Sequence, residues 1–153
     1  MDGPEAFIYR EAAFLDDRAY SAWLDLFAAE GRYWVPLRRG ATSPENELNL
    51  IYEGKLKLER RIGRLTGGKN HAEQPPSEVI RSITNILVVE DTGSRVLCRS
   101  KYIAVIQRLG TTRMVAGDLS HTLIRDAGKF SILQRRLDLL GANEPKEDLS
   151  FIP

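Results

Sequence analysis

The chain has 153 residues, of which 42% are hydrophobic and 28% are charged, the composition of an ordinary folded protein, and we expect a single domain over residues 1–153. Its 22 Lys and Arg residues nearly balance its 21 Asp and Glu residues, so neither nucleic acid nor an anionic membrane is an expected partner. One cysteine, Cys98, excludes an internal disulfide, and Met1 is followed by no apolar leader, so we expect a cytoplasmic protein.

The first part of the chain has the periodicity of helices. Asp2-Gly3-Pro4-Glu5 combines a capping residue, a proline in the first turn and an acid near the positive end of the helix dipole. Asp16 and Asp17 then interrupt the pattern and are expected to cap a second helix. Apolar residues recur at i, i+3, i+4 and i+7 from Tyr20 to Phe27, and Gly31 is suited to end that helix.

The rest of the chain is rich in β-branched and aromatic residues. We expect short strands over 32–37 and 48–52, a basic helix over 55–65, and four long strands over 79–89, 96–107, 114–124 and 130–140. Turn signals at 91–94 and 126–128 make consecutive long strands antiparallel. Asn85 falls inside one of these apolar runs, so we expect a buried amide there. Helices followed by a meander predict an α+β fold, in which a twisted sheet curls over the N-terminal helices.

Two segments carry the most specific motifs of the chain. The first, Phe7 to Leu37, contains Tyr9, Glu11, Ala12, Leu15, Asp16, Trp23, Leu24, Tyr33 and Pro36. The second, His71 to Ile86, reads HAEQPPSEVIRSITNI. Together they resemble the small (β) subunit of the aromatic-ring-hydroxylating dioxygenases, the Rieske non-haem iron oxygenases. The second segment departs from that family at His71, where tryptophan is usual, and at Glu78 and Ile80, where arginines are usual, whereas Arg81 is retained.

The resemblance implies a fold, a role and a set of partners. The fold is the cystatin-like or nuclear-transport-factor-like roll, a curved antiparallel sheet wrapped on N-terminal helices. The role is non-catalytic, in the catabolism of aromatic compounds. The implied partners are a large (α) subunit, which carries the Rieske iron–sulfur cluster and the mononuclear iron, and further copies of this chain, as a homotrimer within a three-plus-three hexamer.

The ligands for an iron centre are missing from the chain itself. A Rieske cluster needs two Cys and two His, and the chain has one Cys. A mononuclear iron site needs two His near a carboxylate, and the only histidines are His71, in an expected loop, and His121, in an expected strand. We therefore expect no cofactor, no metal and no catalytic residue in this chain.

Two other functions remain open from the residues. A free-standing dehydratase or isomerase could pair Asp16 or Asp17 with His121 or His71 in the cone of the roll. A helix cap and a hydrogen-bonded, part-buried histidine explain the same residues without catalysis. A module that only binds a ligand is the third possibility.

A ring of copies requires each protomer to offer two different surfaces. The expected subunit interface combines a basic helix, a segment stiffened by two prolines and the arginine that follows it: Arg60, Arg61, Arg64, His71, Pro75, Pro76, Ser77 and Arg81. The apolar tail over 149–152 is expected to dock either on this chain or on a neighbour.

Overall fold

Three helices and six strands form the described part of this computed structural model, which comprises residues 3–67, 77–141 and 151–153. The helices are α1 (Pro4–Asp16), α2 (Tyr20–Leu24) and α3 (Lys55–Thr66). The strands are β1 (Phe27–Pro36), β2 (Asn49–Glu53), β3 (Glu78–Asp91), β4 (Arg95–Arg108), β5 (Thr111–Asp126) and β6 (Lys129–Leu139).

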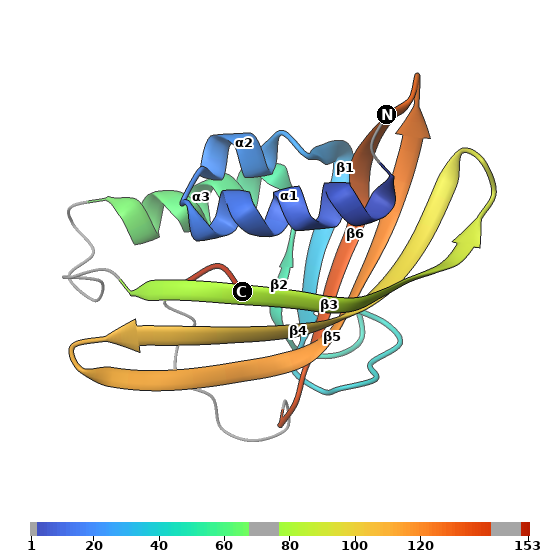
Figure 1. Cartoon of the computed structure of the whole chain (residues 1–153). Coiled ribbons are helices and arrows are strands. Elements are labelled where there is room, and N and C mark those ends of the chain that lie inside the picture. Colours follow the sequence, from blue (N-terminus) through green and yellow to red (C-terminus); the bar gives the residue numbers. More distant parts are fainter. Residues whose placement is uncertain (1–2, 68–76, 142–150) are drawn as a thin grey trace.

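All six strands belong to one sheet with the order β2-β1-β6-β5-β4-β3. The strands β3 to β6 form an antiparallel meander, and β1 joins it by parallel pairing with β6. The sheet twists and curves strongly, and the three helices lie together on one side of it (Figure 1). This arrangement confirms the predicted α+β roll.

Tight turns fix the register of the meander. Between β4 and β5, Leu109 and Gly110 have φ values of 51° and 79°, and between β5 and β6, Ala127 and Gly128 have values of 50° and 76°. Two successive residues with positive φ are the signature of the two-residue turn that matches the twist of antiparallel strands. The register along β4 and β5 then continues without a shift from Arg95 to Arg108.

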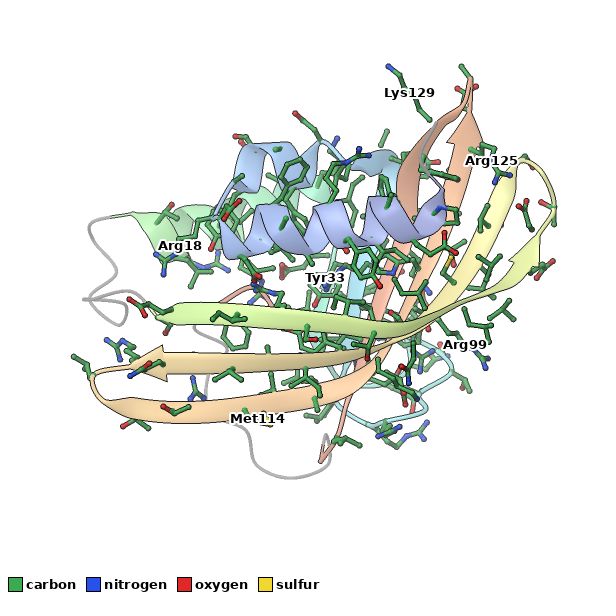
Figure 2. The ribbon with its side chains drawn as sticks, in the orientation of Figure 1. Arg18, Tyr33, Arg99, Met114, Arg125 and Lys129 are labelled. Carbon is green, nitrogen blue, oxygen red and sulfur yellow. The ribbon has the colours of Figure 1, made fainter. Side chains whose placement is uncertain are left out.

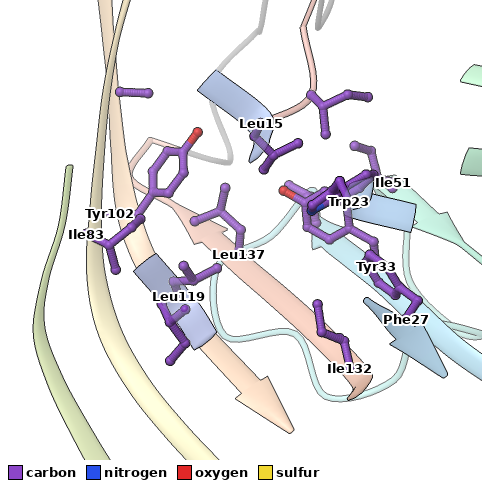
Figure 3. Packing of buried hydrophobic residues seen from close by; sticks show 14 of the residues in the cluster. Leu15, Trp23, Phe27, Tyr33, Ile51, Ile83, Tyr102, Leu119, Ile132 and Leu137 are labelled. Atoms are coloured by element: carbon purple, nitrogen blue, oxygen red, sulfur yellow. The ribbon is translucent and has the colours of Figure 1, made fainter. Parts of the chain in front are cut away.

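The core lies between the helices and the concave face of the sheet. Trp23 of α2 is fully buried and packs edge-on against Phe27 and Tyr33, with ring centroids 5.1 and 6.2 Å apart (Figure 3). Every second residue of β4 from Val96 to Ile106 points into this core. Cys98 is one of them, and its burial raises the pKa of the thiol to about 11.

Two local predictions about the end of the second helix were wrong. The second helix ends at Leu24, before Phe27, and Gly31 lies inside β1 instead of ending a helix. The main chain explains both results, because the amide of Ile132 donates to the carbonyl of Leu26 at 2.7 Å and thereby draws this segment into the sheet. A Cβ atom on Gly31 would lie 2.5 Å from the Ile132 carbonyl oxygen, so a glycine is required at this crossing.

The expected helix cap and the expected buried amide were also wrong. The N-cap of α2 is Ala19, without a side-chain hydrogen bond, whereas Asp16 is the last residue of α1 and Asp17 is its C-cap. Asn85 is exposed and has a φ of 55° at an irregularity of β3, between Thr84 and Leu87. Asparagine tolerates this left-handed conformation better than most residues, which accounts for its position in an apolar run.

Candidate functional site

A cluster of charged and polar side chains is sealed inside the cone formed by the helices and the sheet. Glu11 on α1 accepts a hydrogen bond from Trp23 Nε1 at 2.9 Å and lies 2.8 Å from Nε2 of His121 on β5. Nε of Arg135 on β6 forms an ion pair with the same carboxylate at 2.8 Å. None of these four residues is more than 1% exposed. The cluster therefore connects both helices near the N-terminus to the centre of the sheet.

The ionisation of Glu11 and Arg135 in this cluster is determined by their pairing with each other and with His121. Burial alone would raise the pKa of Glu11, but the Arg135 charge together with the charge and hydrogen bond of His121 lowers it to about 2. The same pairing raises the pKa of Arg135 above its ordinary value against the effect of burial. Glu11 is thus ionised at neutral pH. Because an ionised carboxylate only accepts hydrogen bonds, Nε2 of His121 carries the proton between them.

A second set of contacts closes the wide end of the cone. Arg81 of β3 is buried, and its Nη1 donates to Oδ1 of Asp16 at 2.7 Å. Nη2 of Arg81 donates to the main-chain oxygen of Ile152. Asp16 is therefore held as an ion-pair partner of β3, and the arginine expected at a subunit interface points into this chain.

The segment from Phe151 to Pro153 fills the same opening. Phe151 and Ile152 are buried, and the main-chain oxygen of Pro153 accepts hydrogen bonds from Tyr33 Oη at 2.8 Å and Arg135 Nη1 at 3.0 Å. The tail thus docks on its own chain, one of the two outcomes expected from its apolar character.

This geometry does not suit acid–base catalysis. His121 pairs with Glu11, and not with Asp16 or Asp17 as the alternative function required. A carboxylate with a pKa near 2 is a weak base at neutral pH, and the His121 proton is already committed to it. Asp17 is exposed at the end of α1, and His71 lies outside the described residues. The cluster is suited to hold α1, β5 and β6 in a fixed arrangement.

Glu11 and Arg135 were missed as a pair, although the sequence contains a signal for each. Glu11 follows Phe7 by four residues and precedes Leu15 by four, so it lies on the apolar stripe of α1. Arg135 alternates with Leu137 and Leu139 on the inward face of β6. A charge in phase with buried residues indicates a buried ion pair. Pairing the two across 124 residues required the fold.

The predicted interface residues fall in different environments. Arg60 and Arg64 are exposed on α3, whereas Arg61 is half-buried and binds Glu53 through two hydrogen bonds of 2.8 and 2.7 Å. Ser77 is buried at the start of β3, and its carbonyl oxygen accepts a hydrogen bond from Arg18. Pro75 and Pro76 lie outside the described residues, as does His71.

Two further properties concern possible cofactors and membranes. Within the described ranges, no three His, Cys, Asp or Glu residues converge to hold a metal ion. No helix of the described chain is long and apolar enough to cross a membrane.

Similar proteins of known sequence point to one family. The family model described as ring hydroxylating beta subunit matches residues 10–143. The 2-halobenzoate 1,2-dioxygenase small subunit of Burkholderia cepacia is 29% identical over 88% of this chain and 84% of that subunit. The small oxygenase component of the p-cumate 2,3-dioxygenase system of Pseudomonas putida is 30% identical over 97% of this chain and 84% of that component.

Solved structures share the fold. The beta subunit of the benzoate 1,2-dioxygenase from Burkholderia mallei has a TM-score of 0.77 and 24% identity, covering 97% of this chain and 94% of that one. A chain of naphthalene 1,2-dioxygenase has a TM-score of 0.81 and 23% identity, covering 96% of this chain and 82% of that one. With the family model spanning most of the sequence, the chain belongs to the family of ring-hydroxylating dioxygenase beta subunits.

Proposed function

We propose that this chain is the non-catalytic small subunit of a terminal oxygenase that hydroxylates an aromatic ring, and that it folds as one domain over residues 1–153. The observation that carries the proposal is the family match over residues 10–143. The interior supports a structural role, because the only histidine in the described core is engaged by a carboxylate inside a closed cone. Two of the relatives named above are subunits of dioxygenases of 2-halobenzoate and of p-cumate, so an aromatic substrate for the complex is the corresponding expectation.

The redox centres belong, in this proposal, to the large (α) subunit. There the Rieske cluster would supply electrons and the mononuclear iron would activate dioxygen. This chain cannot supply the Rieske ligands, because it has one cysteine where two are needed. Its contribution is a rigid body, in which ion pairs and a docked tail fix the helices to the sheet.

The expected assembly is a homotrimer of this chain within a three-plus-three hexamer. A cyclic trimer uses two different surfaces of each copy. The exposed arginines Arg60 and Arg64 on α3 remain candidates for one of them, and the proline-containing segment before β3 remains a candidate for the other.

Co-expression with the large subunit tests the proposal. The neighbouring gene that encodes Cys-x-His followed by Cys-x-x-His should be expressed with this chain, and separately without it. We expect co-purification in equal amounts, a mass of three plus three by light scattering, and dioxygen uptake with an aromatic substrate only when the large subunit is present. Dioxygen uptake or stoichiometric iron in this chain alone would contradict the proposal, as would a failure of the two subunits to associate at micromolar concentration.

A further inference from the structure

A cavity of about 600 Å³ opens on the face of the sheet that is turned away from the helices. Its charged lining comes from three strands and the loop between β1 and β2: Arg39, Arg99, Lys101, Asp118, Arg136 and Asp138. None of these residues belongs to the cluster in the cone, since Arg39 is in the loop and the other five alternate with the inward-facing residues of β4, β5 and β6. We call this cavity the outer groove.

The outer groove has more positive than negative charge. Four cationic side chains line it, against two carboxylates. Arg39 and Lys101 share Asp118, and Arg136 binds Asp138 with distances of 2.7 and 3.0 Å. Arg99 is exposed and forms no ion pair with any residue that the structure describes. Two positive charges are therefore left over, and Arg99 is the side chain free to meet an incoming anion.

The walls of the outer groove are held in place by contacts within the chain. The guanidinium of Arg136 stacks on the ring of Trp34 at 4.2 Å and donates to the carbonyl oxygen of Ala41 at 2.7 Å. The amide of Gly40 donates to Asp138 at 3.1 Å, which ties the loop to β6. A groove that is fixed before binding loses little conformational entropy when it is filled.

An exposed apolar strip continues from the outer groove along the same face. Val105 of β4 is paired with Ile80 of β3 on one side and Met114 of β5 on the other, and Ile103 lies two residues beyond Lys101. The exposed fractions are 72% for Ile80, 68% for Met114, 42% for Ile103 and 36% for Val105. Figure 2 labels Arg99 and Met114, which mark the groove and the strip. A continuous patch of this kind is typical of a surface that another protein covers.

We infer that the outer groove and the apolar strip form one docking surface for the large subunit, with an acidic segment of that subunit in the groove. The inference rests on the proposed function. A small anion would use the groove and leave the strip uncovered, whereas a protein chain covers both. Two copies of this chain that met through this same face would place the excess positive charge of one groove against that of the other, and the two surfaces proposed for the trimer lie elsewhere, on α3 and in the segment before β3. An unlike, acidic partner satisfies both the charge and the apolar surface.

Charge reversal in the groove tests this surface in the co-expressed complex. Arg99→Glu should weaken association with the large subunit at least roughly tenfold, because a like charge then faces the acidic segment. Arg95→Glu is the matched control, since Arg95 is exposed four residues away on β4 and outside the groove. Arg99→Gln should have a smaller effect in the same direction. Met114→Asn, which adds no charge, should weaken the complex without changing its salt dependence, whereas Arg99→Glu should change both.

Several outcomes would overturn the inference. Equal affinities for the Arg99→Glu and Arg95→Glu variants, both folded by circular dichroism, would exclude the groove as the docking surface. A change in the self-association of this chain, with no change in its affinity for the large subunit, would assign the surface to a second copy instead. If the unchanged chain does not bind the large subunit at all, the proposed function fails, and this inference fails with it.

Discussion

Glu11 is an ionised carboxylate in the middle of an apolar core, and its three partners come from α2, β5 and β6. Removing water from a carboxylate is unfavourable, so the charge is stable there only while its partners remain in place. Glu11 thus ties the position of α1 to the sheet, and a substitution of Glu11 measures how much the whole cluster contributes to stability.

Replacing Glu11 by Gln should lower the free energy of unfolding by about 3–5 kcal/mol, because Arg135 is then left as a buried charge without its partner. Urea denaturation followed by tryptophan fluorescence measures the change. Glu59→Gln, at an exposed position of α3, is the control and should alter stability by less than about 0.5 kcal/mol. Similar losses of unfolding free energy for the two variants would show that the ion pair contributes little to stability.

The same residue predicts how stability depends on pH. The pKa of Glu11 is lowered from 4.5 to about 2 in the folded chain, so its contribution is fully present above pH 4.5. That contribution should be lost as the pH falls from about 4.5 to about 2, and a shift of this size corresponds to about 3 kcal/mol. Urea midpoints at several pH values test this. The Glu11→Gln variant should lose less stability over that interval than the unchanged chain.

At the scale of elements, a close contact between β1 and β6 determines how these two parallel strands pair within the sheet. The register between these strands shifts between Phe27 and Arg32, and Gly31 lies at this irregularity. The carbonyl of Ile132 approaches so closely that a side chain would collide with main-chain atoms, which cannot move aside as a flexible side chain could. This close contact joins β1, the strand that follows α2, to β6, which lies inside the sheet.

Gly31→Ala should therefore destabilise the chain by about 1–3 kcal/mol, because the new methyl group would force the two strands apart. Gly63→Ala is the matched control. It lies inside α3 with open space around it, and it should be neutral or stabilise by up to about 1 kcal/mol through helix propensity. Thermal denaturation of the two variants compares them directly. A loss of stability for Gly63→Ala as large as that for Gly31→Ala would argue against the steric explanation.

At the scale of the whole molecule, the inward faces of all elements share one core, and the tail from Phe151 to Pro153 completes it. Cys98 lies within this core on β4, fully buried and with a pKa raised to about 11. Its thiol becomes accessible only when the sheet separates from the helices.

A thiol reagent such as dithionitrobenzoate should therefore react with Cys98 very slowly in the native chain. The rate should follow global unfolding and should rise in the Glu11→Gln variant by about tenfold for each 1.4 kcal/mol of unfolding free energy that is lost. Reaction rates at increasing urea concentration make the comparison. Fast labelling under conditions in which the far-ultraviolet circular dichroism is native would indicate local opening of the cone instead.

The sequence by itself determined the class of the fold and the family. The period-2 runs predict all four long strands, since alternating burial is a local property of an extended chain. The turns at Gly93 and Gly128 are local too, because only a few residue types accept positive φ at low cost. The motifs of the two segments, Phe7 to Leu37 and His71 to Ile86, together indicate the dioxygenase small subunit.

The tertiary structure decided what joins distant parts of the chain. The end of the second helix depends on a hydrogen bond from the amide of Ile132, and the partner of His121 is a glutamate 110 positions away. Asp16 and Asp17, expected to cap the second helix or, in the alternative function, to pair with a histidine, lie instead at the end of α1. The outer groove likewise exists only where the loop before β2 meets four strands, β3 to β6. Periodicity shows which side of an element is buried, but a pairing between elements depends on how the sheet curves, and no local pattern contains that information.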